Sequence, residues 1–544
     1  MISEPAVGKA FFGREDVLKV LEKRMNALQG GYRQNVALTG QMLAGKSSII
    51  RQFLATMRSA SLVPVYIEVV PESFPFFASK FIATLLHNYL ALCGREPAKN
   101  VPELMKAAES VIPHTILAAK RVQHAVSRKK YNDAYRKLLN LTSILKKETG
   151  KSCIVIFDEF HNLEFTRIKN PYFHFGRIIM IQKDTMYIVS SSQKNTIKKI
   201  LSEKLALLYG NFEIIEISGF DFATARSFLK QKLGSAALDA RYADYLIDFT
   251  DGNPFYLGVM ARKLASIAAR KGGVAVGPDE IEEAFTELMH NTSGTINQYF
   301  TNTIMSLMEK DLRRDYVDLM IALSHGRDRL KDIASWFGRR NVSGFSAKLG
   351  RLMELDIVSK NGIFYDLQDR VMKFWLRTVY HRRISALVDD IAGRESAFRE
   401  ELRADLNEYL DACRGDTMER TRDLLMAFDG EIAEIAGKKR HLPRFAKTEI
   451  LRYGGMEDMV GYDCRDRYWV FQVNKKRLDE ASVANFIERY YPMKDRISRK
   501  ICVALDGVDE NALLLAKEKC VWVWELADIN ELMKIYKKHR IVAS

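Results

Sequence analysis

The chain has 544 residues, 47% hydrophobic and 28% charged, as expected for a soluble protein of several folded domains. No stretch approaches the roughly 18 apolar residues of a membrane span, and the residue pattern of the first segment gives no expectation of a secretion signal. Six scattered cysteines argue against a disulfide framework or zinc site and indicate a cytoplasmic location. A net charge of +15 favours acidic partners such as nucleic acid or nucleotides, with plain solubility as the alternative.

The first part of the chain, residues 1–218, alternates between apolar runs and helical segments. This pattern predicts an α/β fold with a parallel sheet covered on both faces. A helical insert is expected at about 75–150, and its basic second half is either a nucleic-acid footprint or a solvated helix face. The expected strands are Asn35–Thr39, Val65–Val70, Cys153–Phe157, Met186–Val189 and Phe212–Ile217.

The segment 219–295 has helical periodicity and is expected to form a helical lid, with helices at Ala223–Leu233 and Arg241–Phe249. A second helical region is expected from about Ile304. Residues 300–380 then resemble a winged helix, because two helices, Leu330–Phe337 and Val342–Leu355, precede a hairpin. The hairpin is predicted over 357–367, around an Asn-Gly turn at 361–362.

Beyond the winged helix, helices are expected from about 371 to 436, with a connector at 381–430. A mixed α/β domain is expected at 431–544. Its predicted strands lie near Met459–Tyr462, Trp469–Val473, Ile501–Leu505 and Val521–Trp524.

A phosphate-binding loop follows the first strand. The pattern GxxxxGK[ST] folds backbone N–H groups around phosphate oxygens, while its lysine neutralises phosphate charge and its hydroxyl binds Mg²⁺. Since a strand precedes the pattern and a helix follows it, a merely structural turn is disfavoured. The predicted nucleotide-binding residues are Gly40, Gln41, Met42, Leu43, Ala44, Gly45, Lys46, Ser47 and Ser48, with Ser47 also a metal ligand.

Two adjacent carboxylates end the third apolar run. Asp158 is expected to hold Mg²⁺, and Glu159 to orient and deprotonate the attacking water. The two strands that carry the loop and the acidic pair are expected to be neighbours in one sheet, which brings both groups to the same edge. ATP and Mg²⁺ are therefore the predicted substrate and cofactor.

Four motifs together resemble the archaeal-type ATPases of the AAA+/STAND group. They are the loop, the acidic pair, Phe12-Gly13-Arg14-Glu15 and the segment Asp251–Leu257. The resemblance implies that Arg14 lies near the adenine and that Pro254 packs against the base.

The same resemblance makes Ser192 or Gln193 a sensor near the γ-phosphate. Relatives often carry an arginine after this strand, where Gln193 and Lys194 stand here. An arginine finger would then have to come from a neighbouring subunit, and a homo-oligomer is a candidate assembly.

The winged helix has two interpretations. In the first, Asn341–Leu355 is a recognition helix for duplex DNA; in the second, the module packs on the ATPase and senses nucleotide without DNA. The candidate outward residues are Ser343, Ser346, Lys348 and Arg351, and the candidate phosphate contacts are Arg339, Arg340 and Lys360.

The C-terminal domain resembles the restriction-endonuclease-like domains that end many such ATPases. The resemblance requires a helix glutamate, for which Glu431 and Glu434 are candidates, and an aspartate, which Asp458 fits. The third element reads Gln472-Val473-Asn474, where Asn474 stands in place of the required lysine. We therefore expect an inactive relative of these nucleases.

The leading hypothesis is an ATP-driven switch in which the nucleotide state controls the winged helix and the C-terminal domain. The alternatives are an ATP-gated DNA nuclease, a DNA-binding ATPase, and a signalling ATPase that acts on a protein partner without DNA.

Overall fold

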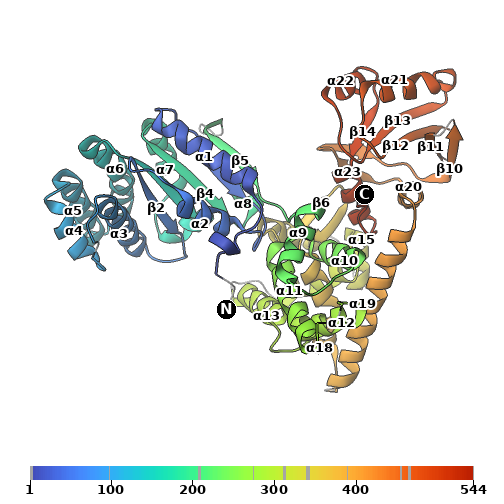
Figure 1. Ribbon diagram of the computed structural model, residues 1–544, viewed down its shortest axis with the longest axis horizontal. Helices are drawn as coiled ribbons and strands as arrows, with labels where there is room; N and C mark the ends of the chain where they lie inside the picture. Colours follow the sequence, from blue (N-terminus) through green and yellow to red (C-terminus); the bar gives the residue numbers. More distant parts are fainter. Residues whose placement is uncertain are drawn as a thin grey trace. The chain divides into compact units, whose positions relative to one another are not determined.

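The computed structural model describes residues 4–96, 98–205, 210–273, 275–309, 314–338, 343–388, 390–453, 456–463 and 467–542. Two compact units make up the chain (Figure 1). Unit 1 comprises Met1–Phe220, Asn253–Phe255 and Glu354–Asp356, and unit 2 comprises Asp221–Gly252, Tyr256–Met353 and Ile357–Ser544. Within the described ranges, every helix is too short or too polar to span a bilayer.

Unit 1 contains the predicted parallel sheet, with strand order β2-β3-β4-β1-β5. All four pairings are parallel. Strand β4 separates β1 from β3, so the expectation that the loop strand and the acidic strand are neighbours was wrong. The strands are β1 (Asn35–Thr39), β2 (Leu62–Glu68), β3 (Ser152–Asp158), β4 (Thr185–Ser191) and β5 (Phe212–Glu216).

Helices cover both faces of this sheet, because alternate strand residues enter two different cores. Ile154 and Ile156 pack with α1 and α2, whereas Val155 and Phe157 pack with the helices of the other face. The helices of unit 1 are α1 (Glu15–Gln29), α2 (Lys46–Thr56), α3 (Phe74–Leu92), α4 (Val101–Glu109), α5 (Pro113–Ser127), α6 (Tyr131–Thr149), α7 (Pro171–Ile181) and α8 (Lys194–Lys199).

The insert between β2 and β3 is helical, as predicted, and consists of α3 to α6. Figure 1 shows these four helices gathered at one end of unit 1. Part of the basic stretch is neutralised locally, since Lys120 pairs with Glu109 and Lys137 pairs with Asp133.

The first part of unit 2 is helical, and the predicted helices near 223–233 and 241–249 are present. The second helical region begins at Thr295, earlier than expected. The helices are α9 (Phe222–Leu233), α10 (Ala240–Thr250), α11 (Pro254–Arg270, which begins in unit 1), α12 (Pro278–Phe285), α13 (Thr295–Glu309), α14 (Arg314–Ser324), α15 (Leu330–Trp336), α16 (Ser343–Glu354), α17 (Arg370–Trp375), α18 (His381–Ser385), α19 (Ile391–Arg414) and α20 (Thr417–Leu425).

The hairpin predicted around Asn361-Gly362 is present as β6 (Val358–Asn361) and β7 (Phe364–Leu367), paired antiparallel. Gly362 has φ 59°, and a Cβ there would lie 1.7 Å from the carbonyl oxygen of Ile432, so only glycine fits this turn. The candidate phosphate contacts Arg339 and Arg340, with Asn341 and Val342, lie outside the described residues, as does the side chain of Ser343.

The C-terminal part of unit 2 is a five-stranded mixed sheet in the order β10-β11-β12-β13-β14. Strand β10 was not predicted. Figure 1 shows α21 and α22 together on one side of this sheet. The elements are β10 (Phe445–Tyr453), β11 (Met456–Asp463), β12 (Tyr468–Asn474), α21 (Glu480–Arg489), β13 (Ile497–Ala504), α22 (Glu510–Glu518), β14 (Trp522–Glu525) and α23 (Leu526–Ile535).

The expectation of helix up to about residue 436 was wrong. After α20 the chain forms a second hairpin, β8 (Ile432–Ile435) and β9 (Lys438–His441). The burial of β8 alternates between exposed and buried, which is the period of a strand. The turn residues Ala436 and Gly437 both have positive φ, as a tight hairpin turn requires.

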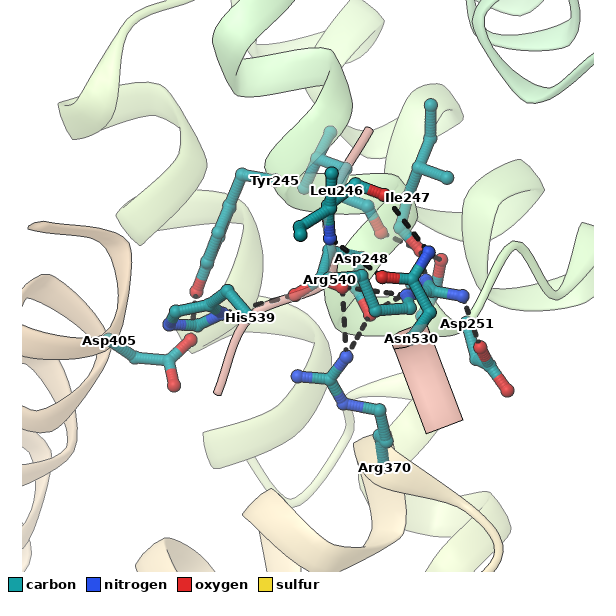
Figure 2. A network of polar contacts seen from close by, with 12 residues as sticks. Tyr245, Leu246, Ile247, Asp248, Asp251, Arg370, Asp405, Asn530, His539 and Arg540 are labelled. Atoms are coloured by element: carbon teal, nitrogen blue, oxygen red, sulfur yellow. Dashed lines mark hydrogen bonds and ion pairs between the residues drawn. The ribbon is translucent and has the colours of Figure 1, made fainter. Parts of the chain in front are cut away.

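A buried ionic network joins three parts of unit 2 (Figure 2). Asp248 in α10 is 1% exposed and accepts hydrogen bonds from Arg370 (3.0 Å) and Arg540 (2.8 Å), while His539 Nδ1 lies 3.1 Å from its second oxygen. Arg540 also donates to Asp251 at 2.6 Å. Burial opposes ionisation of Asp248, but the two arginines and the hydrogen bond with His539 outweigh it and hold its pKa well below the usual range.

Candidate functional site

The predicted phosphate loop connects β1 to the first turn of α2. Leu43 and Gly45 have positive φ (63° and 98°), so the backbone turns back on itself before the helix. A Cβ on Gly40 would lie 2.1 Å from the carbonyl oxygen of Ile217, so only glycine fits there. Met42 is exposed and Ala44 is buried, whereas Ser48 Oγ accepts a hydrogen bond of 3.0 Å from the Ala6 N–H.

Lys46 is the cation of this loop, and its side chain is buried. Its Nζ donates to the carbonyl oxygens of Gly40 (2.9 Å) and Gln41 (2.7 Å). Burial lowers the pKa of Lys46, and the charges of Glu159 and Asp158 oppose that shift. The loop's own carbonyls therefore hold the ammonium group over the loop, close to the two carboxylates.

Asp158, at the end of β3, is the centre of a hydroxyl cluster. Its Oδ2 accepts hydrogen bonds from Ser47 (2.8 Å) and from Tyr66 (2.9 Å), and its Oδ1 accepts one from Ser190. The carboxylate is 2% exposed. Thus the structure places the two predicted metal ligands, Ser47 and Asp158, in direct contact.

Glu159 follows Asp158 in a left-handed backbone conformation (φ 54°). Its Oε2 accepts hydrogen bonds from the Ser192 N–H (3.0 Å) and hydroxyl (2.8 Å). Burial raises the pKa of Glu159, while the Ser192 hydrogen bonds and the charge of Lys46 oppose the rise. A carboxylate with a raised pKa beside a P-loop is suited to accept a proton.

Of the two candidate sensor residues, Ser192 lies at the site and Gln193 turns toward α8. Gln193 precedes that helix, and its Oε1 accepts a hydrogen bond of 3.0 Å from Thr196. Contact with Glu159 therefore belongs to Ser192.

Arg14 and Pro254 occupy different surroundings within unit 1. The Arg14 guanidinium lies 4.8 Å from the centre of the Phe220 ring and donates to the carbonyl oxygen of Ser218. Pro254 begins α11, and its Cγ lies 3.9 Å from the position of a Cβ on Gly45. Pro254 is thus brought to the phosphate loop.

Three residues of the site were not singled out from the sequence: Tyr66, Ser190 and His161. Tyr66 and Ser190 contact Asp158, as described above. His161 Nδ1 lies 2.9 Å from Ser191 Oγ and 3.4 Å from Glu159 Oε2. Only the strand register, which pairs Phe157 with Val189, could have indicated Ser190, because it sets the following residues side by side.

The candidate nuclease residues of unit 2 lie on a separate sheet. Asp458 pairs across β11 and β12 with Gln472, and both are buried. Arg489 forms an ion pair with the Asp458 carboxylate, and the Tyr490 hydroxyl donates to it at 2.9 Å. Asn474 Nδ2 donates weakly, at 3.4 Å, to a strand carbonyl.

The prediction of a helix glutamate for this site was wrong. Glu431 precedes β8 and Glu434 lies within it, so neither is on a helix. Glu431 forms an ion pair with Arg329 (2.5 Å) and accepts a hydrogen bond from the Tyr536 hydroxyl (3.2 Å). Tyr536 packs on one core of this domain, whereas Tyr490, the partner of Asp458, packs on the other. Among the described residues, no three His, Cys, Asp or Glu side chains are grouped to hold a metal ion.

The parallel sheet, the glycine-bounded loop and the carboxylates define unit 1 as the core of a P-loop ATPase. Residues 11–260 match the model of a family described as an ATPase domain predominantly from Archaea. The matched region is just under half of the 544 residues.

Several solved structures are similar to the chain. A Walker-type ATPase of Pyrococcus abyssi is 18% identical, with a TM-score of 0.46, over 69% of this chain and 99% of the other. An ORC2 protein of Aeropyrum pernix is 11% identical, with a TM-score of 0.43, over 74% and 98%. Cdc6p of Pyrobaculum aerophilum is 14% identical, with a TM-score of 0.35, over 74% and 98%. No curated protein matches the chain.

Proposed function

We propose that this chain is an ATP-hydrolysing switch of the AAA+/STAND type, which uses Mg²⁺. The observation that carries the proposal is the contact of 2.8 Å between Ser47 and Asp158, with Lys46 and Glu159 beside them. This set contains a cation for phosphate, two oxygen ligands for a metal and a carboxylate for water.

The bound nucleotide would place its phosphates on the loop of residues 40–47, where backbone N–H groups and Lys46 receive them. Ser47 Oγ and Asp158 fit Mg²⁺ in chemistry, since both supply hard oxygen donors from adjacent positions. Mg²⁺, when bound, supplies positive charge to the β- and γ-phosphates. Lys46 would exchange its two loop carbonyls for phosphate oxygens.

Glu159 is the proposed base for hydrolysis. Its carboxylate would orient a water molecule toward the γ-phosphorus and take up the proton that this water loses. As the new P–O bond forms, the bond to the β,γ-bridging oxygen breaks and ADP leaves with the electron pair. Ser192, which holds Glu159 Oε2, is the proposed sensor because its position depends on where that carboxylate points.

The proposed switch links this chemistry to Pro254. Since Pro254 lies beside the phosphate loop at the start of α11, nucleotide bound there would contact the helix that leads into the lid. The nucleotide state would then bias the proposed winged helix and the C-terminal domain. Arg14 is the proposed neighbour of the adenine, and a second copy is the proposed source of an arginine finger.

Duplex DNA is the proposed partner, in keeping with the net charge of +15. A protein partner is the alternative. We propose that the C-terminal domain does not cleave DNA. The Asp458 carboxylate is already paired with the Arg489 guanidinium, and position 474 is an asparagine and not the required lysine.

The proposal is tested with Lys46→Ala and Glu159→Gln. Lys46→Ala is expected to lose ATP binding, whereas Glu159→Gln is expected to bind ATP and hydrolyse it about 10²–10⁴-fold more slowly. Glu22→Gln, on the exposed face of α1, is the matched control. ATP turnover unchanged in Lys46→Ala would refute the assignment. Equal duplex affinity with ADP and with a non-hydrolysable ATP analogue would refute the switch alone.

A further inference from the structure

Two arginines of the C-terminal domain share one tryptophan ring. The guanidinium carbon of Arg440, on β9, lies 4.0 Å from the centre of the Trp522 ring, and that of Arg499, on β13, lies 5.1 Å from it. Trp469 meets the same ring edge-on, with centroids 5.4 Å apart and an interplanar angle of 88°. Two like charges are therefore held within one small cluster.

The sheet explains why the cluster is fixed in place. Trp469 pairs with Arg499 across β12 and β13, and Trp522 begins β14, the next strand. Trp469 is buried, whereas Trp522 is half-buried and Arg499 is exposed. A buried indole thus supports a ring at the surface, and the ring supports two guanidinium groups.

Neither guanidinium has a carboxylate partner within the described part of the chain. Other arginines of this domain do: Arg452 pairs with Glu457 at 2.9 Å, and Arg477 pairs with Asp509. Arg499 donates a hydrogen bond of 2.8 Å to the backbone carbonyl of Ser498. Burial lowers the pKa of Arg440, and the charge of Arg499 lowers it further, so the pair is electrostatically unfavourable as it stands.

Contact with the ring uses none of the N–H donors of either guanidinium, and in the part of the chain that the structure describes only one donor of Arg499 is bonded elsewhere, to the Ser498 carbonyl. A guanidinium that lies over a ring uses its face, while its N–H donors point outward in its plane. Such a fork matches the oxygens of a phosphate and binds them in a bidentate manner. The cluster therefore has the donors, the positive charge and the rigidity of an anion site.

The neighbouring residues favour a nucleic-acid backbone as the anion. Lys438 lies two residues before Arg440 on β9, which places both on one face of the hairpin, and it is exposed. A row of positively charged side chains suits a ligand with repeating negative charges. Duplex DNA carries one negative charge per roughly 1.7 Å of its axis.

We propose that Arg440 and Arg499, stacked on Trp522, contact the phosphate backbone of duplex DNA. This site rests on the duplex partner named in the proposed function and on nothing else in it. It assigns the contact to the C-terminal domain, separate from the winged helix, and it is independent of the base sequence.

The test is the salt dependence of duplex binding by the full chain without nucleotide, followed by fluorescence anisotropy of a labelled 20-base-pair duplex. Each phosphate contact contributes about 0.9 to the slope of log K against log salt. Arg440→Gln/Arg499→Gln is expected to reduce the slope by about 1.8 and to weaken binding at low salt by at least about tenfold. Arg440→Lys/Arg499→Lys is expected to keep the slope and lose part of the affinity.

Arg452→Gln is the matched control, because that exposed arginine of the same domain already has Glu457 as its partner. Since Arg440 also packs on the sheet, the single variant Arg499→Gln, at an exposed position, repeats the test if the double variant unfolds.

An unchanged slope in folded Arg499→Gln and in the double variant would overturn the proposal. The proposal would also be overturned if the double variant lost binding to a poly-glutamate peptide but kept its duplex binding. That result would indicate an acidic protein partner. If the wild-type chain binds no duplex at 50 mM salt, the DNA partner and this site both fail. The ATPase assignment is then unaffected, because Lys46→Ala tests it separately.

Discussion

Ser47 Oγ and Asp158 Oδ2 are joined by a hydrogen bond of 2.8 Å, although 111 positions separate the two residues along the chain. Ser47 lies in the first turn of α2, after β1, and Asp158 ends β3; these two strands are not neighbours, because β4 runs between them. The hydroxyl of Ser190, near the end of β4, bonds the same carboxylate. The site is therefore built across three strands, with the middle strand supplying a supporting hydroxyl.

We expect Ser47→Ala to weaken the use of Mg²⁺ more than the use of ATP. The substitution removes one of two proposed oxygen ligands and leaves Lys46 in place. The Mg²⁺ concentration for half-maximal ATPase activity should rise by about tenfold or more, the usual scale when a group that supports a metal site is removed. Thr56→Ala, at the exposed end of α2, serves as the control. An unchanged Mg²⁺ requirement would remove Ser47 from the metal site.

The ATPase rate should fall in acid at a higher pH than an ordinary carboxyl group would set. Burial raises the pKa of Glu159, and a base must be deprotonated to act. Activity is thus present above the raised pKa and lost as pH falls through it. The apparent pKa from the pH dependence of kcat should exceed about 4.3, the value of a free glutamate. A limb at or below that value would contradict the role of Glu159.

His161 is expected to act as a positioning residue for Glu159. Its Nδ1 contacts both Ser191 and the Glu159 carboxylate, so its loss should loosen the carboxylate, which Ser192 still holds, without removing any phosphate contact. His161→Ala should lower kcat by about tenfold, a fraction of what a proton-transferring group contributes, and leave KM nearly unchanged. His161→Asn retains a polar atom near Nδ1 and should restore most of the rate. A purely structural role would instead lower stability in both variants.

Arg540→Ala should destabilise unit 2. It removes one of the cations around the buried Asp248, and breaking a buried ion pair costs about 3–5 kcal/mol. Arg370 and His539 remain, so we expect a value near the lower limit, measured from urea unfolding. In Asp248→Asn/Arg540→Ala the penalty should be smaller than the sum of the single penalties, because the unpaired charge is gone.

The control for this experiment is Arg414→Ala. Arg414 pairs with Asp411, but both side chains are mostly exposed, so the expected change is within about 0.5 kcal/mol. Equal effects in Arg540→Ala and Arg414→Ala would show that the network around Asp248 does not stabilise the fold.

Local patterns in the sequence were sufficient to predict the loop strand Asn35–Thr39 and the hairpin around Gly362. Each is encoded by a short run of residues, a strand before a glycine loop in one case and an Asn-Gly turn in the other. The second hairpin, over 432–441, has a weaker signal, because Ala436 at its turn is a good helix former. Its first strand was therefore mistaken for helix.

Contacts between distant residues could not be predicted in the same way. The position of Ser190 beside Asp158 depends on the register of β3 against β4. The contact of Asp248 with Arg540 depends on a tertiary arrangement that no local pattern records. The candidate site was found because its motif contains the reactive residues. Its supporting residues were missed because only their positions in the folded structure connect them with the site.

The network around Asp248 also sets an order of events during synthesis. Arg540 lies 292 positions after Asp248, so the carboxylate has no access to this partner until that whole stretch has been translated. An acidic side chain without its cations resists burial, and domains generally fold as they emerge, N-terminal parts first. Unit 1, whose last segment ends at Asp356, can fold on the ribosome before Arg540 is available to α10. The ATPase core can therefore fold before α10, the helix that precedes Pro254, acquires its ion pair with Arg540.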